Sequence, residues 1–282
     1  MLISAFESAL RIDRQAATFS RSGTTRIVSV VSGKGGVGKT FVSTSLAVLA
    51  ARTGMRVLLI DGDLTLANVD VALGLKAKFH IGDVVHGRAT LAEAVVPGPD
   101  GLFILPGAPS PDRALELSAA EQRAFLEVVR ALTPAYDLVV IDCGAGIGEG
   151  VLFFGRAAQE CIVVVTPEPT SMVDALATIK ALVRRAGVER VSVLVNQASE
   201  RMGREIFRRL VDTVAALPVL LRYVGSVPLD FEVREALLDR RLLLTSRPAC
   251  TASHALIAVG RSWLATNEAA SHSARAEATG VP

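Results

Sequence analysis

Residues 32–48 read SGKGGVGKTFVSTSLAV and contain the most informative motif of the chain. It completes the pattern G-x-x-x-x-G-K-[S/T], and an apolar run over 26–31 directly precedes it. Between a strand and a helix, the backbone N–H groups of such a loop curl around an anion at the helix N-terminus. We therefore expect a phosphate-binding loop here, whereas a glycine-rich turn with a chance lysine is the alternative.

The loop assigns roles to single residues. Lys39 is expected to reach the β- and γ-phosphates of ATP, and the Thr40 hydroxyl to ligate Mg²⁺ beside the nucleotide. A second lysine, Lys34, precedes the glycines although the chain has only five lysines. The residues expected to bind the cofactor in this loop are Gly33, Lys34, Gly35, Gly36, Val37, Gly38, Lys39 and Thr40.

Short β-branched runs alternate with helical patterns along the chain. The runs cover 26–31, 56–61, 102–107, 136–142, 161–167, 191–196 and 223–228. Runs that are apolar on both faces and alternate with helices are typical of a parallel sheet covered on both sides. The expected fold class is therefore α/β, with a mostly parallel central sheet flanked by helices on both faces.

Helix ends and chain ends also follow from local patterns. Capping boxes predict that Ser118 with Glu121 opens a helix over 119–132, and that Ser171 with Asp174 opens one over 172–186. Gly54 and Gly187 are expected as left-handed residues after helices. Residues 26–266 form the expected domain, between an N-terminal partner-binding segment, 1–25, and a disordered tail, 267–282.

Composition excludes several classes of protein. A formal net charge of +2 is too small to indicate a nucleic-acid partner. The three cysteines, Cys143, Cys161 and Cys250, lack CxxC spacing, so neither a zinc site nor a disulfide framework is indicated. No apolar run reaches the length of about 18 residues that a transmembrane helix needs. We expect a cytoplasmic protein.

Carboxylates stand at the ends of two predicted strands. Asp61 and Asp63 stand at the end of LLIDGD, 58–63, and Asp142 is the last residue of YDLVVID, 136–142. Ligands of open α/β sheets bind at the carboxyl ends of the strands, so these groups are expected near the phosphate loop. Asp142 can hold Mg²⁺ through water. A helix-capping role is the alternative for Asp63 and, less strongly, for Asp61.

The segment KGGVGKT resembles the deviant phosphate loop of the MinD/ParA class of P-loop ATPases. The resemblance implies a Rossmann-like three-layer fold, ATP and Mg²⁺ as cofactors, slow hydrolysis and an ATP-dependent homodimer. It implies that Lys34 reaches the partner's nucleotide across the dimer interface. Catalysis would then rest on Lys34, Lys39 and Asp63, with Asp63 orienting the attacking water, while Thr40, Asp61 and Asp142 serve the metal. Cys143 and Gly144 depart from the class pattern after Asp142, and Cys143 is interpreted as a small buried residue.

Later segments complete the expected nucleotide site. Asn196, at the end of VLVNQ, offers a donor and an acceptor to adenine. The segment GSVPLD, 225–230, resembles the second base-contacting loop of the class, in which Pro228 directs backbone groups toward the purine. The resemblance also makes Asp174 a candidate partner of Lys34, but an Asp in a first helical turn is stabilised by the helix dipole without any function.

Within the class, the segments 63–85, 151–160 and 164–175 resemble the FlhG/FleN group, which regulates flagellar number and placement. That resemblance implies partners among FlhF-type GTPases, flagellar switch proteins and transcription regulators, with transient attachment to the inner membrane or cell pole. The motif that engages the GTPase is only partly kept in DRQAATFSR, 13–21, because Arg14 and Ser20 replace its Asp and Arg.

Two other functions stay open. A MinD/ParA-type ATPase could position the division site, the chromosome or another polar cargo, although the C-terminus SHSARAEATGVP is not the basic amphipathic helix that MinD uses. A DNA-binding partition protein is a further alternative, because four arginines line one side of a predicted helix whose Met202, Ile206, Leu210 and Val214 face inward. They are Arg201, Arg204, Arg208 and Arg209. Such a stripe is more often a solvated face, so we expect no DNA partner.

Overall fold

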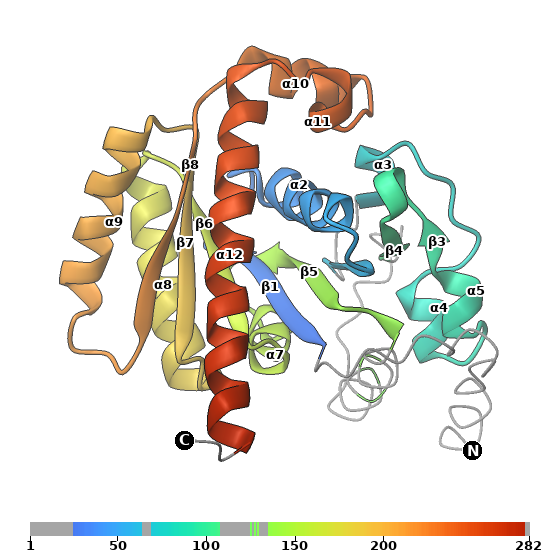
Figure 1. Cartoon of the computed structure of the whole chain (residues 1–282), viewed down its shortest axis with the longest axis horizontal. Coiled ribbons are helices and arrows are strands. Elements are labelled where there is room, and N and C mark those ends of the chain that lie inside the picture. The colour runs from blue at the N-terminus through green and yellow to red at the C-terminus, as the bar shows by residue number, and fades with distance from the viewer. Residues whose placement is uncertain are drawn as a thin grey trace.

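The computed structural model describes residues 25–63, 69–107, 125, 127, 129 and 135–279, with side chains described as far as residue 265 at the C-terminal end. Within these ranges eight strands form one sheet in the order β3-β4-β2-β5-β1-β6-β7-β8 (Figure 1). The strands are β1 (Arg26–Ser32), β2 (Val57–Gly62), β3 (Val96–Pro97), β4 (Phe103–Leu105), β5 (Leu138–Ala145), β6 (Glu160–Val165), β7 (Arg190–Asn196) and β8 (Leu220–Val227).

Every run expected as a strand is a strand, and the neighbours from β4 to β8 pair in parallel. The expected α/β fold with a mostly parallel sheet is therefore confirmed. The sequence analysis missed β3, which pairs antiparallel with β4. A strand of two residues that contains a proline is too short for a period-of-two pattern.

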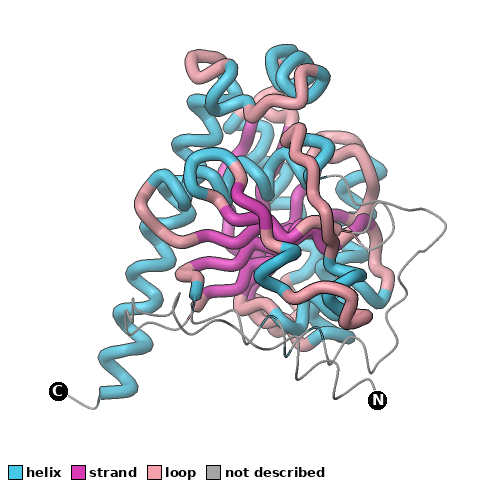
Figure 2. The backbone as a smooth tube through the Cα atoms, turned by 90° about the vertical axis from the view of Figure 1, so that its right-hand side faces the viewer, coloured by secondary structure: helices cyan, strands magenta, loops and turns pink. Residues whose placement is uncertain are grey.

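Helices cover both faces of the sheet, which Figure 2 shows edge-on between them. One core contains side chains of α2, α10, α11 and α12, and the other contains side chains of α4, α5, α7, α8 and α9. The helices are α2 (Lys39–Arg52), α3 (Val69–Ala72), α4 (Ile81–Val85), α5 (Leu91–Ala94), α7 (Glu149–Ala157), α8 (Pro169–Ala186), α9 (Glu200–Val214), α10 (Phe231–Leu238), α11 (Leu243–Ser246) and α12 (Thr251–Thr279).

Helix ends agree with the sequence in part. Gly54 and Gly187 have φ values of +89° and +70°, so the predicted left-handed positions after α2 and α8 are confirmed. The predicted capping box of Ser171 with Asp174 is wrong, because α8 already begins at Pro169. The Ser171 hydroxyl instead accepts a hydrogen bond from the backbone N–H of Thr166, at 3.0 Å. The box predicted at 118–121 lies outside the described residues.

The C-terminal helix crosses the sheet and extends beyond it (Figure 1). The indole of Trp263 is fully buried, donates to Glu160 at 3.4 Å and carries the Arg26 guanidinium 4.9 Å from its ring centroid. Glu160 in turn pairs with Arg26 on β1, so α12 is fastened to the sheet. Helix α12 continues to Thr279, where we expected a disordered tail over 267–282. The alanines of this stretch favour helix.

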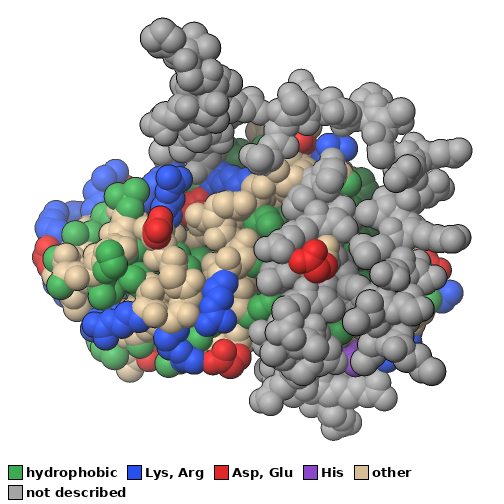
Figure 3. Space-filling view, turned by 90° about the horizontal axis from the view of Figure 1, so that it is seen from below, with side chains coloured by type: hydrophobic (Ala, Val, Ile, Leu, Met, Phe, Trp, Pro, Cys, Tyr) green, Lys and Arg blue, Asp and Glu red, His purple; other side chains and the backbone are tan. Residues whose placement is uncertain are grey.

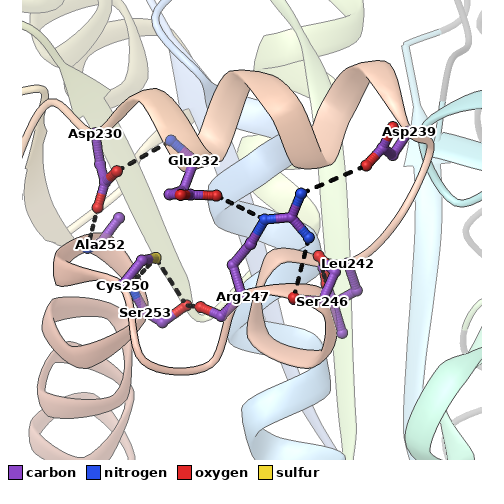
Figure 4. A network of polar contacts seen from close by, with 9 residues as sticks. All are labelled: Asp230, Glu232, Asp239, Leu242, Ser246, Arg247, Cys250, Ala252 and Ser253. Atoms are coloured by element: carbon purple, nitrogen blue, oxygen red, sulfur yellow. Dashed lines mark hydrogen bonds and ion pairs between the residues drawn. The ribbon is translucent and has the colours of Figure 1, made fainter.

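The segment α10–α11 is joined to the start of α12 by a polar network (Figure 4). The Asp230 carboxylate accepts hydrogen bonds from the backbone N–H of Glu232, in the first turn of α10, and of Ala252, in the first turn of α12, both at 3.0 Å. Arg247 donates to Glu232 at 2.6 Å and lies 3.7 Å from Asp239. One acidic residue therefore caps two helices, and one arginine ties both ends of α10 to the following turn.

No helix in the described ranges is both long and apolar enough to cross a membrane. The expected N-terminal segment, apart from Thr25, lies outside those ranges.

Candidate nucleotide-binding site

The phosphate loop joins β1 to α2 at the carboxyl edge of the sheet. Its last glycine, Gly38, has a φ of +88° and is the residue from which α2 begins, so this turn needs glycine. The next two residues point at one carboxylate: Lys39 Nζ lies 3.4 Å from Asp142 Oδ1, and the Thr40 hydroxyl donates to Asp142 Oδ2 at 2.6 Å. The structure thus brings together three residues that the sequence placed in the site.

Asp142 is completely buried at the end of β5. Burial raises the pKa of this carboxyl above its ordinary value, while Lys39 and the Thr40 hydroxyl act in the opposite direction. A hydroxyl and a carboxylate at the start of a helix are oxygen donors of the kind that Mg²⁺ takes beside nucleotide phosphates. Among the described residues no group of three His, Cys, Asp or Glu side chains could hold a metal. The Thr40 hydroxyl and the Asp142 carboxylate fit Mg²⁺ bound together with a nucleotide.

Asp61 lies beside Asp142 in the register of β2 and β5 and is also completely buried. Its two carboxylate oxygens accept backbone N–H groups, one from Asp63 at 3.1 Å and the other from Val69 at 3.0 Å. Val69 is the first residue of α3. Asp61 therefore anchors the chain on both sides of residues 64–68, which lie outside the described ranges.

The Asp63 carboxylate lies close to the backbone of β5. A Cβ atom added at Gly144 would be 3.6 Å from Asp63 Oδ1, which is ordinary van der Waals contact. Gly144 is one of the two positions at which the sequence departs from the MinD/ParA pattern. The departure therefore lies directly beside a residue expected to orient water.

Lys34 pairs with Glu168 and lies 3.4 Å from the Thr170 hydroxyl. Asp174, its candidate partner in the sequence, lies against Gly33 of the loop with its backbone and its Cβ atom. A Cβ atom at Gly33 would lie 2.3 Å from the carbonyl carbon of Asp174, so only glycine allows this approach. The sequence analysis missed Glu168, although its place just after a predicted strand puts it at the same edge of the sheet.

Asn196 reaches the same loop from β7. Its side-chain amide is buried and donates to the carbonyl oxygen of Val37 at 2.8 Å. We expected the Asn196 amide to bind adenine, but one of its N–H groups is already bonded to the phosphate loop. Pro228 follows β8 directly and is half-buried. It lies two residues before Asp230, which caps α10 and α12.

Cys143 and Cys161 are buried thiols and not nucleophiles of this site. Cys143 is completely buried, and burial raises the pKa of its thiol well above the ordinary value. Burial likewise raises the pKa of Cys161 to about 11. Thiols of this kind remain protonated and inert, which agrees with the interpretation of Cys143 as a small buried residue.

The arginine stripe of α9 is largely a solvated face. Arg204 pairs with Glu200 at 2.8 Å and Arg209 with Glu205 at 2.6 Å. Met202, which we expected to face inward, is 41% exposed. In the visible part of the lower face, Asp and Glu side chains lie among the Lys and Arg side chains (Figure 3). Mixed charge of this kind favours solvent over a nucleic-acid backbone.

Known proteins resemble the chain over most of its length. The family model described as "CobQ/CobB/MinD/ParA nucleotide binding domain" matches residues 28–243. The chain is 42% identical over 238 residues to the antiactivator FleN of Pseudomonas aeruginosa, covering 84% of this chain and 85% of that protein. It is 28% identical over 250 residues to the flagellum site-determining protein YlxH of Helicobacter pylori, covering 87% and 84%.

A solved structure shares the fold. The septum site-determining protein MinD from Pyrococcus horikoshii, complexed with Mg-ADP, superposes with a TM-score of 0.71 at 29% sequence identity. The match covers 84% of this chain and 94% of that one.

Proposed function

Because the chain belongs to the CobQ/CobB/MinD/ParA nucleotide-binding domain family, we propose that it is an ATP-dependent, dimerising switch that regulates flagellar number and placement. As a member of the MinD/ParA group within this family, the chain is an ATP hydrolase. The flagellar part of the proposal is supported by the likeness to FleN and YlxH over most of the length of both proteins.

The observation that carries the nucleotide part is the cluster of Lys39, Thr40 and Asp142 beneath the phosphate loop. In the proposal, Lys39 supplies positive charge to the β- and γ-phosphate oxygens of ATP, and Thr40 and Asp142 hold Mg²⁺, with Asp61 behind them. Bound Mg²⁺ neutralises phosphate charge that one lysine leaves uncompensated. Asn196 and Pro228 border the base, and Asp63 orients water beside Gly144.

Lys34 is proposed to act in a second copy of the chain. Its partner Glu168 is well exposed, with 60% of its side chain accessible, and Lys34 itself is about one-third exposed. An ion pair at such a surface is worth about 0–1 kcal/mol. A cation supplied from another subunit accelerates phosphoryl transfer by about 10³–10⁵-fold. Lys34 can therefore leave Glu168 at little cost in free energy and bind a phosphate group of the second subunit. Hydrolysis then depends on formation of the dimer.

The partners are proposed by family resemblance. Residues 1–25 are a candidate partner-binding segment, for an FlhF-type GTPase in the first place, and flagellar switch proteins or transcription regulators are further candidates. Transient attachment to the inner membrane or the cell pole belongs to the same proposal. The second candidate function, positioning of the division site or another polar cargo, is favoured by the likeness to MinD.

The test of the function uses Lys39→Ala, which removes the lysine beside Asp142. Calorimetry should show binding of Mg-ATP to the wild-type protein and none to this variant. Cells in which the variant replaces the native protein should show the same altered flagellar number as cells that lack it. Normal flagella with misplaced division sites would instead establish the second candidate.

A further inference from the structure

A buried hydroxyl at the carboxyl end of β6 takes no part in the contacts above. Thr166 follows β6 directly and is 3% exposed. Its Oγ1 atom has no hydrogen-bond partner among the residues that the structure describes, and no other buried side-chain nitrogen or oxygen in those ranges shares this condition. Leaving a buried hydroxyl without a partner destabilises a fold, so the position calls for an explanation.

The alternation of β6 shows where this hydroxyl points. Val165 packs in the core on the side of α7 to α9, and Val164 packs in the core on the side of α2. Side chains alternate along a strand, so Thr166 points to the side of α2 and the phosphate loop. Val165 pairs with Val195, so the next register step places Thr166 beside Asn196, which holds Val37 of that loop.

The backbone around Thr166 is tied to the same loop. The N–H of Thr166 donates to the Ser171 hydroxyl in the first turn of α8, and the backbone of Asp174 one turn later packs on Gly33. Between these points, Glu168 holds Lys34. The junction of β6 and α8 therefore contacts the phosphate loop through Glu168 and Asp174, whereas the Thr166 hydroxyl in the same junction has no partner among the described residues.

We propose that Thr166 is a positioning residue for the phosphate loop, whose hydroxyl gains a backbone partner within residues 33–38 when nucleotide is bound. The inference rests on the proposed nucleotide function and adds a residue to it. While the Thr166 hydroxyl has no partner, it lowers the stability of the fold. In the bound arrangement its new hydrogen bond favours the nucleotide.

The test compares Thr166→Val with wild type by thermal unfolding, without ligand and with saturating Mg-ADP, and by calorimetric titration with ADP. Without ligand, the melting temperature of Thr166→Val should equal or exceed that of wild type by about 2–4 °C, because valine has the same shape and no polar atom. Its dissociation constant for ADP should rise about five- to tenfold, since one hydrogen bond in the bound state is lost. Thr166→Ser keeps the hydroxyl and should restore wild-type affinity.

Thr178→Val is the matched control. Thr178 is also a fully buried threonine, but its hydroxyl donates to the backbone carbonyl oxygen of Asp174, one turn earlier in α8, at 2.9 Å. This variant should melt lower than wild type and bind ADP normally. The inference is overturned if Thr166→Val melts lower than wild type and binds ADP normally, or if both measurements are unchanged. Absence of any response to nucleotide in the wild-type protein would instead overturn the proposed function.

Discussion

The two buried carboxylates of the site, Asp61 and Asp142, have different contacts. Asp142 and Asp61 lie side by side and fully buried at the ends of neighbouring strands. The Asp142 carboxylate accepts hydrogen bonds from the side chains of Lys39 and Thr40, whereas the Asp61 carboxylate accepts hydrogen bonds from backbone N–H groups. Asp61 thus shapes the loop that carries Asp63, while Asp142 is the carboxylate placed beside the groups expected at the phosphates.

Lys34→Ala tests the proposed action in a second subunit. The variant should bind Mg-ATP with near wild-type affinity, because the structure places Lys39 and not Lys34 beside Asp142. Its ATP turnover should fall by about 10²-fold or more, and it should not dimerise with ATP. Calorimetry and light scattering measure the two properties. Loss of ATP binding as complete as in Lys39→Ala would contradict the assignment.

Asp63→Ala should slow hydrolysis by about 10²-fold while leaving Mg-ATP binding intact, because its proposed role is to orient water. The variant should therefore accumulate as an ATP-bound dimer, which gel filtration with ATP detects. Asp70→Ala, a change at an acidic residue of the neighbouring helix α3, serves as the control with normal turnover. If Asp63→Ala binds ATP and stays monomeric, the role of Asp63 is structural.

At the scale of elements, α10 and α12 depend on the same carboxylate. Hydrogen bonds from the backbone N–H groups of Ala252 and Glu232 lower the pKa of Asp230 below its ordinary value. A carboxyl whose pKa is lowered by folding stabilises the protein above its unfolded pKa, near 4, and loses this contribution as the pH falls through the lowered folded value. The junction of α10 with the start of α12 should therefore lose stability in acid.

Asp230→Ala removes the capping acceptor of both helices. We expect a loss of about 2 kcal/mol, or about 1 kcal/mol for each cap, and a melting temperature lower by about 4–8 °C at pH 7. Because the lost contribution exists only while Asp230 is ionised, the difference from wild type should shrink below pH 4. Asp239→Ala removes only an exposed contact with Arg247 at 3.7 Å and should change stability by less than about 0.5 kcal/mol.

At the scale of the whole molecule, exposed apolar side chains gather at the edge that carries the phosphate loop. Val71, Ile147 and Val173 all follow the carboxyl ends of strands and are all exposed. Because the carboxyl ends of parallel strands meet at one edge, these residues belong to segments that leave the same edge of the sheet as the phosphate loop. Apolar groups around a charged centre are what a subunit interface requires, which supports the proposed dimer.

Val173→Glu should abolish ATP-dependent dimerisation and leave ATP binding intact, since a buried unpaired carboxylate at an interface is strongly unfavourable. Val173 is 65% exposed, so the free subunit should fold normally. Leu220→Glu is the matched control: Leu220 is 66% exposed but lies at the amino end of β8. Analytical ultracentrifugation with ATP separates them. Equal dimerisation by both variants would place the interface elsewhere.

The sequence by itself determined the features that depend on neighbouring residues. The phosphate loop, every strand run from β1 to β8 apart from β3, and the left-handed Gly54 and Gly187 follow from short-range patterns of apolar, β-branched and glycine residues. Asp142 was found in the same way, because a carboxylate at the end of a buried strand must emerge at the ligand edge.

Only the tertiary structure decided which distant groups meet. Glu168 reaches Lys34 across 134 positions of the chain, and Asn196 reaches Val37 across 159. The capping box at Ser171 failed because α8 already begins at Pro169, and the Ser171 hydroxyl accepts the backbone N–H of Thr166. Local patterns state what a side chain can bond, whereas the packing of the sheet and its helices selects the partner among all groups brought within reach.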